Sequence, residues 1–439
     1  RFICNVYVAM DKSRQLLEKR LPAGGFGRNV ITLMTGTTVA QAIPIAISPI
    51  LTRLYSPSDF GLLALFISLT SICGSIANGR YELAIVLPVK DEEAINITAL
   101  CVLIAAFFSI VLLAVVLIFH DYIVVKLGNP DLALWLYFVP LAVFLVGLFN
   151  ALNYFHVRTK KYKDIANATV NKSIATAATQ LFLGFAKAGS SGLVLGQMVS
   201  YITGNTVLSK NILKEKILLK SVNKTEIKRL AARYADFPKY SMWSILANTL
   251  AYNLINVFIS YLFGAAILGF YSIGNRVLGA PSSLVGTSFG QVFLQRATEE
   301  KNKIGSATNI FLKTAKTLLL IGLPPFILLY FIMEDLFAFV FGPEWRIAGT
   351  YAKIMLPLFF VRFFVSPLST INSVFEQQRI SLIWQISLLL SSLTIMAIAI
   401  YSHMTITEFL IVFSITSMVL YIIAFIVFYL VSKGKPLMR

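Results

Sequence analysis

The stretch Ala94–Phe119, AINITALCVLIAAFFSIVLLAVVLIF, contains no charged residue. As an α-helix it would be about 39 Å long at 1.5 Å per residue, which is enough to cross a hydrocarbon core of about 30 Å. Comparable apolar runs recur along the chain, and the mean hydropathy is +0.77. These features predict an all-α integral membrane protein.

Turn sequences such as Gly128-Asn129-Pro130 and Gly342-Pro343 separate the apolar runs. This punctuation predicts about twelve transmembrane helices. Their approximate ranges are 29–53, 59–78, 94–119, 131–156, 165–187, 190–209, 241–263, 267–294, 311–333, 346–369, 380–402 and 407–432.

The distribution of basic residues predicts the orientation of these helices. The chain carries 38 Lys and Arg residues against 20 Asp and Glu, a net charge of +18. In the predicted topology, thirty of these 38 basic residues fall on the same side of the membrane. Basic loops usually face the cytoplasm. We therefore expect both termini to be cytoplasmic. A nucleic-acid partner is not expected, because the basic residues alternate with apolar spans instead of forming one surface.

The longest polar stretch, 210–240, holds nine basic residues and separates six predicted spans from six. It is either a solvated cytoplasmic connector or an amphipathic segment on anionic lipid. The expected division comprises an amino tail at 1–28, a first bundle at 29–209, the linker at 210–240, a second bundle at 241–432 and a carboxyl tail at 433–439. Met10 opens a basic segment, so we expect residues 1–9 to precede the native start.

A shift of 208 residues relates the two halves. It aligns Leu51-Thr-Arg-Leu-Tyr with Ile259-Ser-Tyr-Leu-Phe, and Phe60-Gly61 with Leu268-Gly269, at the first-to-second-helix junction of each half. An even number of spans in each half keeps both halves in the same orientation. The match therefore predicts parallel repeats related by an axis along the membrane normal.

Four basic residues, and no acidic one, lie well inside apolar stretches: Lys172, Arg276, Lys353 and Arg362. An ionisable group at membrane depth is costly and marks a candidate functional site. Arg276 is the leading candidate, at roughly 14 Å from the outer end of its span, and adjacent Asn275 can share hydrogen bonds to a ligand. The alternative for Arg276 is a structural bond to carbonyls of a neighbouring helix.

The other candidates carry similar alternatives. Lys353 and Arg362 are half a turn apart on one helix, so an undistorted helix cannot aim both at one cavity unless Pro357 reorients it. Lys172 lies where its long stem can reach cytoplasmic headgroups. Arg80, beside Glu82 at the cytoplasmic mouth of the second span, either receives an anionic substrate or pairs with Glu82.

The segments Leu51-Thr-Arg-Leu-Tyr-Ser-Pro-Ser-Asp-Phe-Gly and Asn78-Gly-Arg-Tyr-Glu-Leu-Ala-Ile-Val-Leu-Pro resemble the start of bacterial polysaccharide or O-antigen flippases of the Wzx type. Gly269-Phe-Tyr-Ser-Ile-Gly-Asn-Arg-Val-Leu and Phe375-Glu-Gln-Gln-Arg are similar to that family too. Its superfamily includes multidrug and toxic compound extruders and lipid II flippases. The resemblance implies two six-helix bundles around a central cavity.

It also implies a function: moving an undecaprenyl-diphosphate-linked oligosaccharide from the cytoplasmic to the periplasmic leaflet of the bacterial inner membrane. The expected partners are this lipid-linked glycan, membrane lipids and polysaccharide assembly proteins. The alternative is an ion-coupled exporter of another small or lipid substrate in the same superfamily. Cation extruders of that group typically have buried acidic residues, which this chain lacks within its apolar runs.

No enzyme activity, metal or cofactor is expected. The three cysteines, Cys4, Cys73 and Cys101, have no paired spacing and no neighbouring histidine or acid cluster. The predicted outer loops are short, which argues against a membrane-bound polymerase or ligase.

Overall fold

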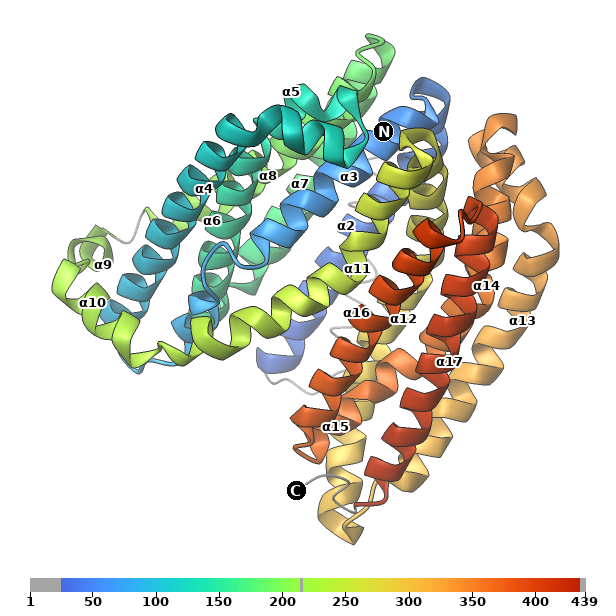
Figure 1. Ribbon diagram of the computed structural model, residues 1–439. Coiled ribbons are helices and arrows are strands. Elements are labelled where there is room, and N and C mark those ends of the chain that lie inside the picture. Colours follow the sequence, from blue (N-terminus) through green and yellow to red (C-terminus); the bar gives the residue numbers. More distant parts are fainter. Residues whose placement is uncertain (1–24, 214–215, 435–439) are drawn as a thin grey trace. The chain divides into compact units, whose positions relative to one another are not determined.

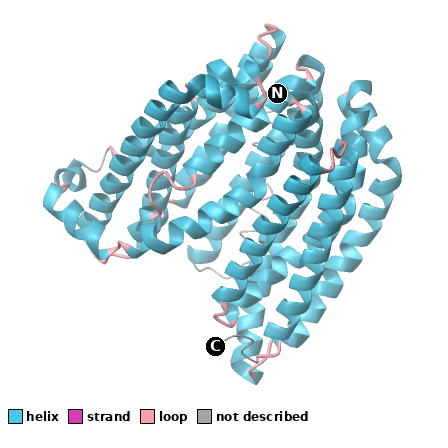
Figure 2. Ribbon diagram, viewed as in Figure 1, coloured by secondary structure: helices cyan, strands magenta, loops and turns pink. Residues whose placement is uncertain are grey.

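The computed structural model describes residues 25–213 and 216–434, and every regular element in these ranges is helical (Figures 1 and 2). A helix covers most of every predicted span, which confirms the all-α membrane fold class. Within the described residues, eight helical segments are long and apolar enough to cross a membrane. The other four predicted spans are not among these eight, so the count of twelve crossings stays a prediction. The amino tail up to residue 24 and the end of the carboxyl tail lie outside the described residues.

The chain divides into two compact units. Unit 1 contains residues 1–54, 69–126 and 130–246, and unit 2 contains residues 55–68, 127–129 and 247–439.

Unit 1 is built from long helices. They are α2 (Gly25–Leu54), the second part of α3 (Pro57–Gly74), α4 (Asp91–Leu127), α6 (Val139–Arg158), α7 (Tyr162–Phe185) and α8 (Ser190–Ile212), with the short elements η1 (Tyr81–Val86), η2 (Pro130–Leu132) and α5 (Ala133–Leu136). Helix α7 packs against both α2 and α8. Small residues allow this close packing, since a Cβ at Gly36 would fall 2.6 Å from the Cβ of Ala166. The small residues therefore allow the backbones of α2 and α7 to approach closely.

The described part of the basic linker is helical and belongs to unit 1. It forms α9 (Lys216–Lys220), α10 (Lys224–Arg233) and the π-helical turn η3 (Phe237–Ser241). The Asn96 side chain on α4 donates to the Ser221 carbonyl at 3.0 Å and accepts from the Asn223 backbone N–H at 2.8 Å. Tyr81 Oη donates to the Ala231 carbonyl at 2.9 Å. Hydrogen bonds therefore attach this segment to the rest of unit 1. The expectation of a solvated connector did not include such an attachment.

Unit 2 contains the second set of long helices. They are α11 (Met242–Phe263), α12 (Ala265–Ile304), α13 (Thr308–Phe341), α14 (Arg346–Val365), α16 (Gln378–Tyr401) and α17 (Ile406–Ser432), with the short elements η4 (Pro343–Trp345), η5 (Ser366–Thr370) and α15 (Ile371–Val374). Helix α14 packs against α12, α13 and α17. This central position matters for function because α14 carries two of the predicted cations, Lys353 and Arg362.

The start of α3 crosses α12 inside unit 2 at the two glycines matched by the 208-residue shift. A Cβ at Gly61 would fall on the carbonyl of Ala265, and a Cβ at Gly269 would fall on the carbonyl of Pro57. The two contacts are reciprocal, because Pro57 and Ala265 are themselves related by the same shift. Glycine is needed at both positions for the backbones to approach this closely.

Candidate functional site

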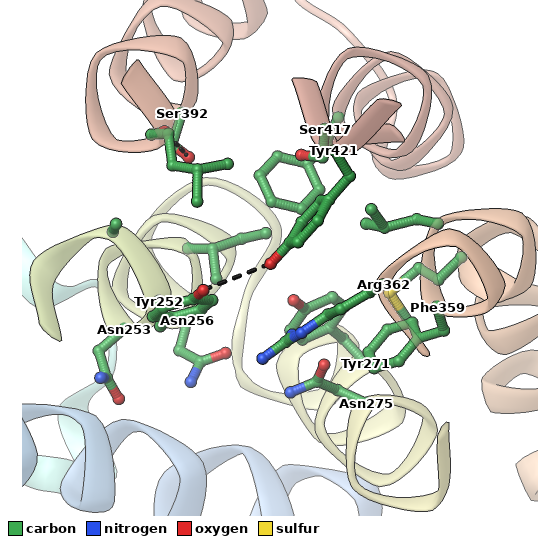
Figure 3. Close-up of a pocket in the computed structure, with 16 residues that line it drawn as sticks. Tyr252, Asn253, Asn256, Tyr271, Asn275, Phe359, Arg362, Ser392, Ser417 and Tyr421 are labelled. Carbon is green, nitrogen blue, oxygen red and sulfur yellow. Dashed lines mark hydrogen bonds between the residues drawn. The ribbon is translucent and has the colours of Figure 1, made fainter. Parts of the chain in front are cut away.

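Unit 2 encloses a cavity of about 320 Å³ between α11, α12, α14, α16 and α17 (Figure 3). Its lining combines one cation with neutral polar and aromatic groups. The polar residues are Tyr252, Asn253, Asn256, Tyr271, Asn275, Arg362, Ser392, Ser417 and Tyr421. No Asp or Glu of the described residues is among the lining residues. The cavity therefore offers a positive charge and many hydrogen-bonding groups without a competing carboxylate.

Arg362 supplies the charge. Its side chain extends from α14 into the cavity, toward Tyr252, Tyr271 and Asn275 (Figure 3). The guanidinium carbon lies 5.1 Å from the ring centroid of Tyr252 and 5.9 Å from that of Phe359. Among the described residues, the Arg362 guanidinium has no ion-pair partner and no hydrogen-bond partner. A half-buried guanidinium that contacts aromatic faces and has no carboxylate partner keeps its N–H donors available for an anionic ligand.

Two tyrosines close one side of the cavity. The hydroxyls of Tyr252 on α11 and Tyr421 on α17 lie 3.4 Å apart (Figure 3). Tyr421 is buried and its ring packs edge-to-face on Trp384 of α16, with centroids 5.0 Å apart. The hydroxyl pair therefore links α11 and α17 across the cavity and is held in place by an aromatic contact behind it.

Three asparagines complete the polar lining. Asn256 donates to Ser68 Oγ at 2.8 Å, and Asn253 donates to the Thr249 carbonyl at 2.9 Å. Both bonds use the amide nitrogen, which leaves the amide oxygens as acceptors. Asn275 lines the cavity, and its exposed side-chain amide has no hydrogen bond to any described residue. Such amide groups suit the hydroxyls of a sugar, because they can both donate and accept.

The structure brings two of the predicted site residues, Asn275 and Arg362, into this one cavity. Arg276 follows Asn275 on α12 but is not a lining residue. It is half-buried, and its guanidinium makes no hydrogen bond or ion pair with a described residue. Its side chain leaves the helix about 100° away from that of Asn275, which explains why only one of the two neighbours reaches the cavity.

Lys353 has a partner that its apolar sequence context did not reveal. Its Nζ lies 3.1 Å from Glu334 Oε1 on α13 and 5.6 Å from the ring centroid of Tyr330. Both charged side chains are about a third exposed, at 34% and 30%. Lys353 is thus neutralised by a nearby acid, unlike Arg362 on the same helix.

The remaining candidates lie in unit 1. Lys172 Nζ lies 4.1 Å from the ring centroid of Phe149 and 5.7 Å from that of Tyr201. Arg80 pairs with Glu82 at 3.1 Å, and its Nε donates to Ser241 Oγ at 3.5 Å. The geometry of Arg80 matches the paired alternative expected for it.

Several lining residues escaped the sequence analysis because they are uncharged. Tyr252, Asn253 and Asn256 share one side of α11 at helical spacing, and Phe413, Ser417 and Tyr421 repeat every fourth position on α17. A polar stripe on one face of an otherwise apolar span is a readable signal for a cavity. The charged residues alone did not reveal this polar stripe.

Solved structures similar to this chain are membrane transporters. An inward-facing multidrug resistance MATE family transporter of the MOP superfamily aligns with a TM-score of 0.64 and 15% identity, covering 90% of this chain and 94% of that one. The lipid II flippase MurJ, in an inward closed conformation, aligns with a TM-score of 0.65 and 14% identity, covering 89% of each chain. A MOP superfamily transporter from Pyrococcus furiosus aligns with a TM-score of 0.59 and 14% identity, covering 95% of this chain and 97% of that one.

These identities are low, so the similarity establishes the fold. No curated protein matches the chain. The model of one protein family, described as polysaccharide biosynthesis protein, matches residues 50–349, which include both glycines of the crossing and the cavity residues of α11 and α12. The chain therefore belongs to the Polysacc_synt_3 family of polysaccharide biosynthesis proteins and has the fold of the MOP superfamily transporters.

Proposed function

We propose that this protein is a flippase that moves an undecaprenyl-diphosphate-linked oligosaccharide from the cytoplasmic to the periplasmic leaflet of the bacterial inner membrane. It acts as a transporter and not as an enzyme, exposing its site alternately to the two sides. Its family and its structural neighbours support a role in moving a polysaccharide precursor. Both termini and the basic linker lie in the cytoplasm in this proposal.

One observation carries the proposal: an arginine without an ionic partner in the cavity of unit 2. Arg362 lies there among asparagine, tyrosine and serine groups, and no described carboxylate lines the cavity. A diphosphate has to lose water on entering such a site, and a guanidinium compensates this loss with charge-assisted hydrogen bonds. The amide and hydroxyl groups then contact the attached sugars.

The same observation argues against the ion-coupled export of an organic cation through this cavity. A cationic substrate would approach Arg362 with no lining carboxylate to offset the repulsion. An exporter of a neutral or anionic lipid would be compatible with the lining. Transport assays with different substrates separate these possibilities.

The proposal can be tested in a strain that lacks its own flippase and carries this gene. Arg362→Ala should lower surface polysaccharide display by roughly tenfold to a hundredfold, because hydrogen bonds to charged groups contribute about 1.5–3 kcal/mol. Arg362→Lys should retain part of the activity, because the charge remains without the planar fork. Display is measured by electrophoresis of surface glycans, and membrane abundance by immunoblotting.

A matched control is Arg346→Ala on the same helix. Arg346 is exposed and pairs with Asp335 at 2.7 Å, away from the lining residues. This variant should display normal amounts of glycan. Normal display by Arg362→Ala at ordinary abundance would refute the proposed role of the cavity.

A further inference from the structure

A second hollow of unit 2 is almost entirely apolar. It has a volume of about 290 Å³ and lies between the first half of α16 and the second half of α17. Ile380, Ala424 and Phe428 form a buried floor, whereas the rim residues Ile383 and Ile423 are 47% and 49% exposed. Ser387 is the one polar lining residue. We call this hollow the α16–α17 groove.

The groove and the polar cavity are lined by consecutive residues on both helices. On α16, Ser387 lines the groove and Leu388 lines the cavity. On α17, Leu420 lines the groove and Tyr421 lines the cavity.

The junction between the two hollows is an aromatic contact. Trp384 of the groove packs on Tyr421 of the cavity, with ring centroids 5.0 Å apart. The two hollows together span about 18 Å along α16, from Ser392 in the cavity to Ile380 in the groove. One helix pair thus carries a polar compartment and an adjoining apolar compartment.

We infer that the α16–α17 groove binds the isoprenoid chain of the transported lipid next to its diphosphate, while the polar head occupies the cavity. This inference rests on the proposed function and adds a binding site for the lipid chain. The occupant must be amphipathic, because the two adjoining compartments differ in polarity. A bulk phospholipid keeps its headgroup at the membrane surface. Its acyl chains therefore begin there and not at the Trp384–Tyr421 junction.

The direction of the groove fits uptake from one leaflet. The groove lies near the start of α16 and the end of α17, which are cytoplasmic ends in the predicted orientation. A lipid whose head has reached the cavity can keep its first isoprene units in this groove, still within the cytoplasmic half of the membrane. The groove therefore removes the need to expose those units to the polar cavity.

Photocrosslinking tests directly whether the isoprenoid chain binds in the α16–α17 groove. A benzophenone amino acid is placed at Ile383 on the groove rim or, as a control, at Ile398 on the same helix, which is not a groove residue and has a similar exposure of 43%. The intact protein is reconstituted in phosphatidylethanolamine–phosphatidylglycerol vesicles with tritiated undecaprenyl diphosphate or tritiated phosphatidylglycerol.

The Ile383 position should label undecaprenyl diphosphate about tenfold more than phosphatidylglycerol at equal mole fraction, because binding of the diphosphate in the cavity holds the attached chain at the groove. The Ile398 position should label both lipids equally. Equal labelling of the two lipids at Ile383 would overturn the inference, because it would mean contact with bulk lipid alone.

A second pair of variants separates this inference from the proposed function. Ser387→Phe fills the groove and should lower specific labelling at Ile383 and flipping of the lipid-linked glycan by about tenfold. The matched control is Thr394→Phe, an exposed position on the same helix that lines neither the groove nor the cavity, and it should leave both unchanged. If Arg362→Ala abolishes flipping but Ser387→Phe behaves like Thr394→Phe, the groove inference fails and the proposed function stands. If Ile383 labelling is specific but Arg362→Ala flips normally, the cavity proposal fails instead.

Discussion

Arg362 and Lys353 lie on the same helix, α14, in opposite electrostatic surroundings. Arg362 faces aromatic rings in the cavity, whereas Lys353 meets Glu334 at 3.1 Å. The sequence identified both as cations in an apolar run. It could not show the pairing, because Glu334 lies 19 residues earlier on a different helix. The helical offset between the two cations was readable, and it explains why they have different neighbours.

Glu82 is the single buried acidic side chain among the described residues, at 3% exposure. Burial raises the pKa of this carboxyl, while its own backbone N–H and Arg80 act in the opposite direction. A raised pKa in the folded state means that the folded protein binds more protons than the unfolded chain. This contribution to stability is complete below the ordinary carboxyl pKa and is lost as the pH rises through the folded-state pKa.

Glu82→Gln should therefore weaken the pH dependence of stability and leave the protein at least as stable near neutral pH. Thermal unfolding in detergent at a series of pH values measures this, with Glu92→Gln as an exposed control on α4. A pH profile for Glu82→Gln identical to that of the wild type would show that Glu82 does not titrate in this way.

At the scale of elements, the helix positions followed well from apolar runs and turn residues. The weak 208-residue match between the halves also identified the two glycines that the structure places in reciprocal contact. The helical docking of α10 was not predicted, because its attachment depends on Asn96 and Tyr81, which belong to distant parts of the chain. Contacts of this kind leave no local pattern in a sequence.

The crossing of α3 and α12 should tolerate no side chain at its centre. Gly61→Ala or Gly269→Ala places a methyl group on a backbone carbonyl, so the helices must separate, at a cost of about 1–3 kcal/mol for overpacking. Thermal unfolding in detergent should show a lower midpoint for each variant. Gly279→Ala on α12 is the control, because its nearest neighbour would be Phe359 Cε1 at an ordinary 3.9 Å. Equal midpoints for all three variants would contradict the importance of the crossing.

At the scale of the whole molecule, the distribution of basic residues predicts how the protein is oriented. Single cysteines at Val222 and Asp121 are introduced into a variant without native cysteines, since both positions are exposed. A membrane-impermeant maleimide added to intact cells with a permeable outer membrane should label position 121 and not position 222. Labelling of position 222 under these conditions would mean that the linker is periplasmic and that the orientation is reversed.

The fold class and the family follow from apolar patterning and from a few family-like segments. The cavity could be recognised only from the structure, because it combines side chains from five helices that are far apart in the chain. Asn275 and Arg362 could be chosen as candidates from the sequence because one neighbours a cation and the other is itself charged, and their role in binding stays a prediction. The tyrosines and serines around them became site candidates only when the helices were placed together.

The most direct test of the account is flipping by the purified protein. The protein is reconstituted in vesicles with a fluorescent undecaprenyl-diphosphate-linked glycan, and the fraction of label accessible to a membrane-impermeant quencher is followed over time. We predict protein-dependent flipping that falls at least about tenfold in Arg362→Ala and is unchanged in Arg346→Ala. The account would be contradicted if vesicles containing folded protein flipped the lipid no faster than protein-free vesicles, or if both variants flipped it at the wild-type rate.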